Sequence, residues 1–269
     1  MLNDSLFARG LKDRRLSLIV WIICLILLAL MMALLFNSVK GFNMDQFLEN
    51  RSESQRDFIK AFAGEDLDFS NPAVYLHGRL FNLFAPLLLL ILAISIGSDS
   101  LAGEEGRGTL DLLLSAPLHR RRAVLEKFAT MCAALATAAF AFWLGLVAGA
   151  LMIKMDINHL YLAETTMSML MLAIAVGSLS MLVGGASGNK GLAIGIATGF
   201  AAGSWLLSML ADIISGIKPY RRLSAFYYYI GNYPLKNGMN WLYFLVLLAL
   251  AVLFLGATLF LFERRDLAV

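Results

Sequence analysis

The sequence has few charged residues and almost none of the residues that build metal centres or disulfides. Charged residues make up 15% of the chain, against about a quarter in an ordinary soluble domain, whereas 59% are hydrophobic. The two cysteines, Cys24 and Cys132, lie inside apolar runs, and the three histidines, His77, His119 and His159, are scattered. This spacing argues against a disulfide framework and a Cys/His metal site, and it predicts two free thiols.

A small net charge and a missing nucleotide-binding motif argue against two further classes of function. The net charge of +3 is too small to imply a nucleic-acid partner. A P-loop of the form G-x-x-x-x-G-K-[ST], whose backbone amides would cradle phosphate, is also missing. The nearest string, from Gly184 to Gly191, lacks the Gly-Lys-Ser/Thr ending and predicts a turn between two helices. The sequence therefore predicts a chain that is not an enzyme and binds no cofactor itself.

The chain contains several long apolar runs, and its mean hydropathy is +0.74. A helix needs about 20 mostly apolar residues to cross a hydrocarbon core roughly 30 Å thick. No internal repeat or low-complexity tract is evident, so we expect one all-α integral membrane domain over 1–269. The first run is too long for the core of a signal peptide and is expected to be retained. The runs predict six spans, at Leu16–Phe36, Leu80–Gly97, Phe128–Ile153, Ala163–Gly184, Leu192–Ile214 and Trp241–Phe262.

The Lys and Arg residues beside the spans predict the orientation. Their totals on the two sides are nearly balanced, but those on one side cluster close to span ends, as Arg14-Arg15 and Arg264-Arg265 do. This asymmetry places both termini in the cytoplasm and the protein in the cell membrane. Residues 1–15 space apolar side chains at helical intervals between basic ones, which predicts an amphipathic helix at the inner membrane surface.

The first outer loop, about 37–78, is long enough to carry structure of its own. It holds seven acidic residues and two apolar patches at helical spacing, and Gly64 and Asn71-Pro72 end the pattern. We expect one or two short outer helices there, with a solvated loop as the alternative. The role of this loop is left open.

The loop between the second and third spans, about 98–127, is the most informative segment. Glu104, Glu105 and Arg107 place charge directly beneath a span. Gly108-Thr109 starts a helix, since the Thr hydroxyl can cap backbone donors, and Pro117 stops it. A helix of under two turns is not stable alone, so its leucines must be buried against the bundle, the lipid surface or a partner protein.

The string from Glu104 to Pro117, Glu-Glu-Gly-Arg-Gly-Thr-Leu-Asp-Leu-Leu-Leu-Ser-Ala-Pro, followed by Arg120 and Lys127, resembles the coupling loop of ABC-2-type permeases. These are the membrane subunits of one exporter class of ATP-binding-cassette transporters. The amphipathic start, the six spans and a final outer segment extend the resemblance over the chain. It implies a six-helix bundle with re-entrant outer helices at about 215–239. His119, where a small polar residue is more usual, and the long first outer loop depart from the pattern.

The resemblance implies that the helix from Thr109 to Ser115 docks into a cleft on a separate ATPase subunit, which holds ATP and Mg. Two permeases would pair, as a homodimer or as a heterodimer with a related permease, and closure of two ATPases would switch the bundle between inward- and outward-accessible states. The residues that the resemblance assigns to coupling are Glu104, Glu105, Arg107, Gly108, Thr109, Leu110, Asp111, Leu112, Leu113, Leu114, Pro117 and Arg120.

The fifth span carries a glycine ladder with a spacing of four residues, which lies nearly on one helix face. Small residues let membrane helices approach closely, so we expect this face to pack against another helix, within the chain or across a dimer. A single pair in the third span, Gly145 and Gly149, is a weaker signal of the same kind. The ladder consists of Gly191, Gly195, Gly199 and Gly203.

Two other classes of function stay open beside the permease. An integral-membrane enzyme acting on lipid could use Arg221, Arg222 and nearby tyrosines for a headgroup, but no acid–base pair accompanies them. A secondary transporter or channel would carry buried charges at mid-membrane, where these spans are almost purely apolar. A neighbouring gene with a P-loop would favour the permease.

Three carboxylates lie near span ends: Asp99, Glu164 and Asp212. Ionisable groups within a membrane are functional candidates by default. All three are close enough to an interface to be hydrated, and we interpret them as interface residues.

Overall fold

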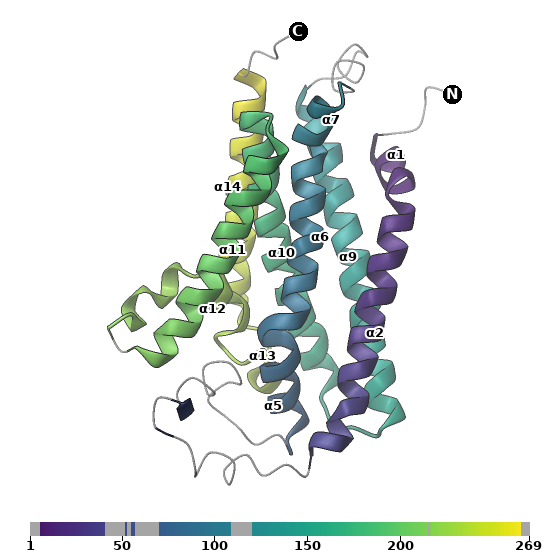
Figure 1. The fold of residues 1–269 in the computed structure, drawn as a ribbon, viewed down its shortest axis with the longest axis vertical. Coiled ribbons are helices and arrows are strands. Elements are labelled where there is room, and N and C mark those ends of the chain that lie inside the picture. Colours follow the sequence, from purple (N-terminus) through teal and green to yellow (C-terminus); the bar gives the residue numbers. More distant parts are fainter. Residues whose placement is uncertain are drawn as a thin grey trace.

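The computed structural model describes residues 6–40, 52, 55–56, 70–108, 120–214 and 216–264, and every regular element in these ranges is a helix. Six helices there are long and apolar enough to cross a membrane, which confirms the predicted number of spans. They run roughly along the long axis of the molecule, and α1 and the end of α14 lie at the same end (Figure 1). The spans are Arg15–Ser38, Pro72–Ser100, Arg120–Met152, His159–Ser187, Lys190–Ala211 and Trp241–Arg264.

The second span starts earlier than predicted. We expected the outer loop to continue to Gly78, with Asn71-Pro72 ending a helical pattern. Instead, the Asn71 side chain accepts a hydrogen bond from the Ala73 N–H (2.9 Å), and Pro72 occupies the first turn, so this pair begins a helix. The prediction was wrong here because Asn-Pro serves a helix start as well as a loop. The helix runs through α5 (Pro72–Leu76), the π-helix η1 (His77–Phe84) and α6 (Ala85–Ser100).

Helix α10 (His159–Ser187) forms the centre of the bundle. It packs against α6, α9 (Arg120–Met152), α11 (Lys190–Ile213) and α14 (Trp241–Arg264), while α2 (Arg15–Val39) packs against α9. Leu172 and Val176 on α10 are fully buried. Large apolar side chains on α2, α11 and α14 remain exposed, as expected where helices face lipid. Cys24 on α2 and Cys132 on α9 are free, as predicted.

Helices α6 and α10 approach each other closely at glycine. A Cβ added at Gly97 would overlap the carbonyl oxygen of Gly177. One turn away, the Ser180 hydroxyl donates to the carbonyl of Ile94 at 3.1 Å. Helix α6 therefore needs a hydrogen atom in place of a side chain at Gly97, and a Cβ at Gly177 of α10 would lie 2.8 Å from the Met131 sulfur of α9.

The glycine pair and the glycine ladder differ in what they contact. A Cβ at Gly149 would lie 2.6 Å from the Ala33 Cβ of α2, so the pair in α9 is a packing site. On α11, a Cβ at Gly195, Gly199 or Gly203 would meet nothing within 4 Å in the part of the chain that is described. Among the described residues these three glycines therefore make no close helix contact, and packing of the ladder against another helix stays a prediction.

These contacts predict opposite outcomes for two glycine-to-leucine variants. Gly97→Leu inserts a side chain where two backbones touch, and overpacking of this kind costs about 1–3 kcal/mol or more. We expect Gly97→Leu to lower the melting temperature in detergent, followed by size-exclusion chromatography after heating. Gly199→Leu should leave the melting temperature of the protomer unchanged, because its Cβ position is open. Equal melting temperatures for Gly97→Leu and the wild type would contradict this packing.

The segment after α11 folds back onto the bundle as three short helices, η2 (Lys218–Leu223), α12 (Ala225–Ile230) and α13 (Pro234–Asn237). The Tyr229 side chain is fully buried, and its hydroxyl donates to the carbonyl of Phe81 at 2.9 Å. The Ser224 hydroxyl donates to the carbonyl of Ser204 at 2.6 Å. Short helices therefore occupy the segment where the resemblance implied re-entrant ones, and α13 lies beside α5 in Figure 1. Their entry into the membrane stays a prediction.

Candidate functional site

The two ends of the predicted coupling loop, 98–108 and 120–127, lie within the described residues. Glu104 and Glu105 belong to the short helix α7 (Ala102–Gly106), Arg107 follows it, and Gly108 has a left-handed backbone with φ +67°. The predicted leucine-rich helix itself lies outside the described residues, and Arg120 begins α9. The coupling residues outside the description are Thr109, Leu110, Asp111, Leu112, Leu113, Leu114 and Pro117.

At the base of this loop, Asp99 binds three cations from three separate elements. Its carboxylate accepts from Arg14 at the junction of α1 and α2 (2.5 Å), from Lys190 at the start of α11 (2.9 Å) and from Arg107 (3.0 Å). The Asp99 side chain is 15% exposed. A Cβ at Gly103 would overlap this carboxylate, so glycine there lets α7 lie directly against it.

Further ion pairs tie the neighbouring helix ends together. Lys127 of α9 binds Glu104 of α7, and both side chains are largely buried. Arg121 of α9 binds Glu263 of α14 through two hydrogen bonds, but this pair is more exposed. Exposed pairs contribute about 0–1 kcal/mol, whereas breaking a buried pair costs several. The Asp99 and Glu104 pairs therefore hold the loop base to the bundle.

Helix α1 (Leu6–Asp13), which confirms the predicted N-terminal helix, also packs at this end. The Glu126 carboxylate of α9 accepts from the Phe7 N–H (3.3 Å) and from Arg122 (2.8 Å). A Cβ at Gly10 would lie 3.0 Å from the Thr130 side chain. The contacts of α1, α7 and the α9 start thus gather at one end of the bundle, where Figure 1 places α1 and α7.

The role of Asp99 was missed by the sequence reasoning, which interpreted it as a hydrated interface residue. The carboxylate is instead largely buried among cations. The predicted topology put all three cations on the same side as Asp99, but nothing in their spacing indicates convergence. Glu164, by contrast, has a structural role, because its carboxylate accepts from the Met239 N–H at 2.7 Å. The side chain of Asp212 lies outside the described part.

The residues considered for a lipid-modifying enzyme make packing contacts. The Arg221 guanidinium lies 5.3 Å from the ring centre of Tyr227, whose hydroxyl is hydrogen-bonded to that of Tyr243 (2.6 Å). Over the described ranges, no group of three His, Cys, Asp or Glu side chains could hold a metal ion. The side chains of Arg221, Tyr227 and Tyr243 therefore pack against one another.

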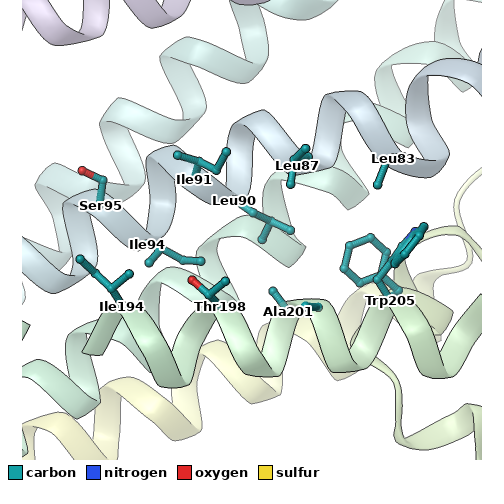
Figure 2. A pocket seen from close by; sticks show the side chains of 12 residues that line it. Leu83, Leu87, Leu90, Ile91, Ile94, Ser95, Ile194, Thr198, Ala201 and Trp205 are labelled. Atoms are coloured by element: carbon teal, nitrogen blue, oxygen red, sulfur yellow. The ribbon is translucent and has the colours of Figure 1, made fainter. Parts of the chain in front are cut away.

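An apolar groove of about 560 Å³ lies between η1/α6 and α11. Leu87, Ile91 and Ile94 line one wall and Ile194 lines the other, and Ser95 and Thr198 contribute hydroxyl groups (Figure 2). Its lining suits an apolar ligand and offers few hydrogen bonds. The two helices that form the groove are the ones joined at the loop end by Asp99 and Lys190.

Comparison with family models matches residues 5–267 to the ABC-2 family transporter protein family. A comparison with curated proteins gives no match. The match covers nearly the whole chain, including the six candidate spans and the loop with its ion-paired base. The chain therefore belongs to the ABC-2 family of multi-pass transporter membrane proteins, permeases that lack a nucleotide-binding domain and work with a separate ATPase subunit.

Proposed function

We propose that the chain is the permease half of an ABC exporter that moves a hydrophobic or amphipathic substrate out across the cytoplasmic membrane. A separate subunit hydrolyses the ATP. The observation that carries this proposal is the Asp99 cluster, because it joins the base of the coupling loop to the first, second and fifth spans. A displacement of the loop is thereby passed to the helices that line the apolar groove.

The transport step follows from these contacts. The ATPase holds the leucine-rich helix between Thr109 and Ser115, and closure of two ATPases moves α7. Glu104 transmits the movement to α9 through Lys127, and Arg107 transmits it to Asp99. Asp99 at the end of α6 and Lys190 at the start of α11 then shift relative to each other, which opens or narrows the groove between these helices.

The glycine ladder of α11 supports a pairing of two copies. Three of its glycines present a face that no described residue covers, and small residues on such a face allow a second helix to approach closely. We propose a homodimer that covers this face, with a related permease as the alternative partner. Helix α1 lies at the inner membrane surface, and the short helices η2, α12 and α13 dip into the membrane from the outer side.

Cysteine labelling tests the orientation. With Cys24 and Cys132 replaced by serine, Gln55→Cys should react with a membrane-impermeant maleimide in whole cells. Glu105→Cys and Leu267→Cys should react only after the membrane is opened, because both positions are cytoplasmic in the proposed topology. Labelling of position 105 or 267 from outside, with position 55 protected, would invert the orientation.

Co-purification with an ATPase, followed by ATP hydrolysis in nanodiscs, tests the function. The permease should hold the ATPase in a stable complex whose hydrolysis rises when the transported compound is added. Transport by the purified chain alone, driven by an ion gradient, would assign it to the secondary transporters instead.

A further inference from the structure

A polar pocket of about 450 Å³ lies between the ends of α2, α5 and α9. Figure 1 places these helix ends opposite α1 and α7. The buried side chains of Phe36 and Met155 contribute apolar walls. The Ser70 hydroxyl donates to the carbonyl of Lys40 at 3.3 Å, which joins the α2 wall to the α5 wall. The polar lining residues are Asn37, Lys40, Ser70, Asn71, Lys154 and Asp156.

The pocket brings two cations and one carboxylate together. Lys40 and Lys154 supply the positive charges and Asp156 the negative one, and all three side chains are exposed to the pocket and its mouth. None of the three forms an ion pair with another residue in the described ranges. The charges are therefore available to a ligand that carries both signs.

The backbone at Lys154 is strained in a way that points to a role for its side chain. Lys154 has φ +54°, and α9 ends with hydrogen bonds from the Met155 N–H to Ala150 (2.8 Å) and from the Lys154 N–H to Leu151 (3.3 Å). This is the double hydrogen bond of a helix C-terminus whose left-handed position favours glycine. A lysine there keeps a conformation that costs energy, and such strain gathers at ligand-binding positions.

The parts of α2 and α9 next to the pocket expose apolar side chains that hydrocarbon chains can contact. Leu34 and Leu35 on α2 and Leu151 and Met152 on α9 are between 43% and 71% exposed, and they lie within two turns of the lysines. A ligand with a charged head in the pocket and apolar chains along these helices would match both regions. That combination is the chemistry of a membrane phospholipid.

We propose that this pocket binds the headgroup of a phosphatidylethanolamine-type phospholipid. Lys40 and Lys154 bind its phosphate, and Asp156 binds its primary ammonium group, which has three N–H donors. The ligand belongs to the leaflet opposite the coupling loop, so the choice of the outer leaflet rests on the proposed function. The binding itself requires only that the helices span a bilayer.

Native mass spectrometry of the full chain in detergent measures this binding, with phosphatidylethanolamine, phosphatidylcholine and phosphatidylglycerol as probes. Lys154→Gly removes the charge and relaxes the backbone, so the variant should fold at least as stably as the wild type. We expect it to bind phosphatidylethanolamine roughly tenfold more weakly, the loss of one charge-assisted contact. Asp156→Asn should weaken the binding of phosphatidylethanolamine by a similar factor. The same variant should bind phosphatidylglycerol as tightly as the wild type does, or more tightly.

The matched control is Lys218→Gln, which removes an exposed lysine outside the pocket and should bind like the wild type. Unchanged binding in both Lys154→Gly and Lys40→Gln would overturn the proposal, as would an equal loss in Lys218→Gln. Phosphatidylcholine has a quaternary ammonium group without N–H donors. If the wild type bound it as tightly as phosphatidylethanolamine, the pairing of Asp156 with the ammonium group would be overturned. Binding of soluble O-phosphoethanolamine but not of the lipid would overturn the lipid source. The assay contains no ATPase, so its failure leaves the exporter proposal standing.

Discussion

The double variant Leu112→Asp with Leu113→Asp is expected to lose the ATPase and all ATP-driven transport while its membrane bundle stays folded. The predicted leucine-rich helix would be too short to be stable alone, so the proposed docking must bury its leucines in the partner. Two carboxylates without partners in that cleft would cost several kcal/mol each. The bundle should survive because the ion pairs of Asp99 and Glu104 hold the loop base from outside this helix.

Pull-down of the ATPase and size-exclusion chromatography of the permease distinguish the outcomes. Replacing the same two leucines by methionine is the matched control, because it keeps an apolar surface of similar volume and should retain the complex. Retained ATPase binding and transport in the aspartate variant would show that coupling runs elsewhere. Aggregation of the permease without its partner would mean that the leucines pack against their own spans.

The second large effect is expected for Asp99→Ala. Without the carboxylate, the cations of Arg14, Arg107 and Lys190 lie together with no counter-charge between them. Breaking a fully buried ion pair costs about 3–5 kcal/mol, and the exposure of Arg107 and Lys190 reduces this to roughly 1–3 kcal/mol. We expect a lower melting temperature and a fall of about tenfold or more in transport, with the ATPase still bound, because the ion pairs that link the loop base to α11 and to the start of the first span are then lost.

Glu263→Ala serves as the control for this experiment. It removes an ion pair to Arg121 at the same end of the bundle, but that pair is more exposed, so we expect a smaller fall in melting temperature than for Asp99→Ala. Melting temperature of the permease alone and ATP-driven transport by the complex are the two readouts. Wild-type values of both in Asp99→Ala would show that the cluster neither stabilises the end of the bundle nor carries coupling.

The sequence by itself determined that this chain is a six-helix membrane protein. Apolar runs of about 20 residues in a bilayer must satisfy their backbone groups internally, so they become helices whatever surrounds them. The absence of a P-loop and the loop motif from Glu104 to Pro117 likewise indicated a permease before any contact was known, and the family match over residues 5–267 confirms it. These features can be recognised from the sequence because each depends only on local composition or on contiguous residues.

The tertiary structure decided where polar residues are buried. The second span begins at Pro72 although His77 and Arg79 interrupt its apolar run, because His77 is buried with its ring stacked 3.6 Å from that of Tyr233. Asp99 meets Arg14 and Lys190 across 85 and 91 residues of chain. Such distances depend on which helices lie side by side, and no periodicity along one helix encodes them.

The placement of neighbouring helices also explains the contacts of the glycines and the position of the polar pocket. The pair at Gly145 and Gly149 packs because α2 lies against α9, whereas a Cβ at Gly195, Gly199 or Gly203 on α11 would meet no described residue within 4 Å. Lys40 and Lys154 are more than a hundred residues apart and line one pocket only because two helices end at the same level. A sequence pattern marks a helix face that can pack or bind, and the neighbour that the fold supplies decides what that face contacts.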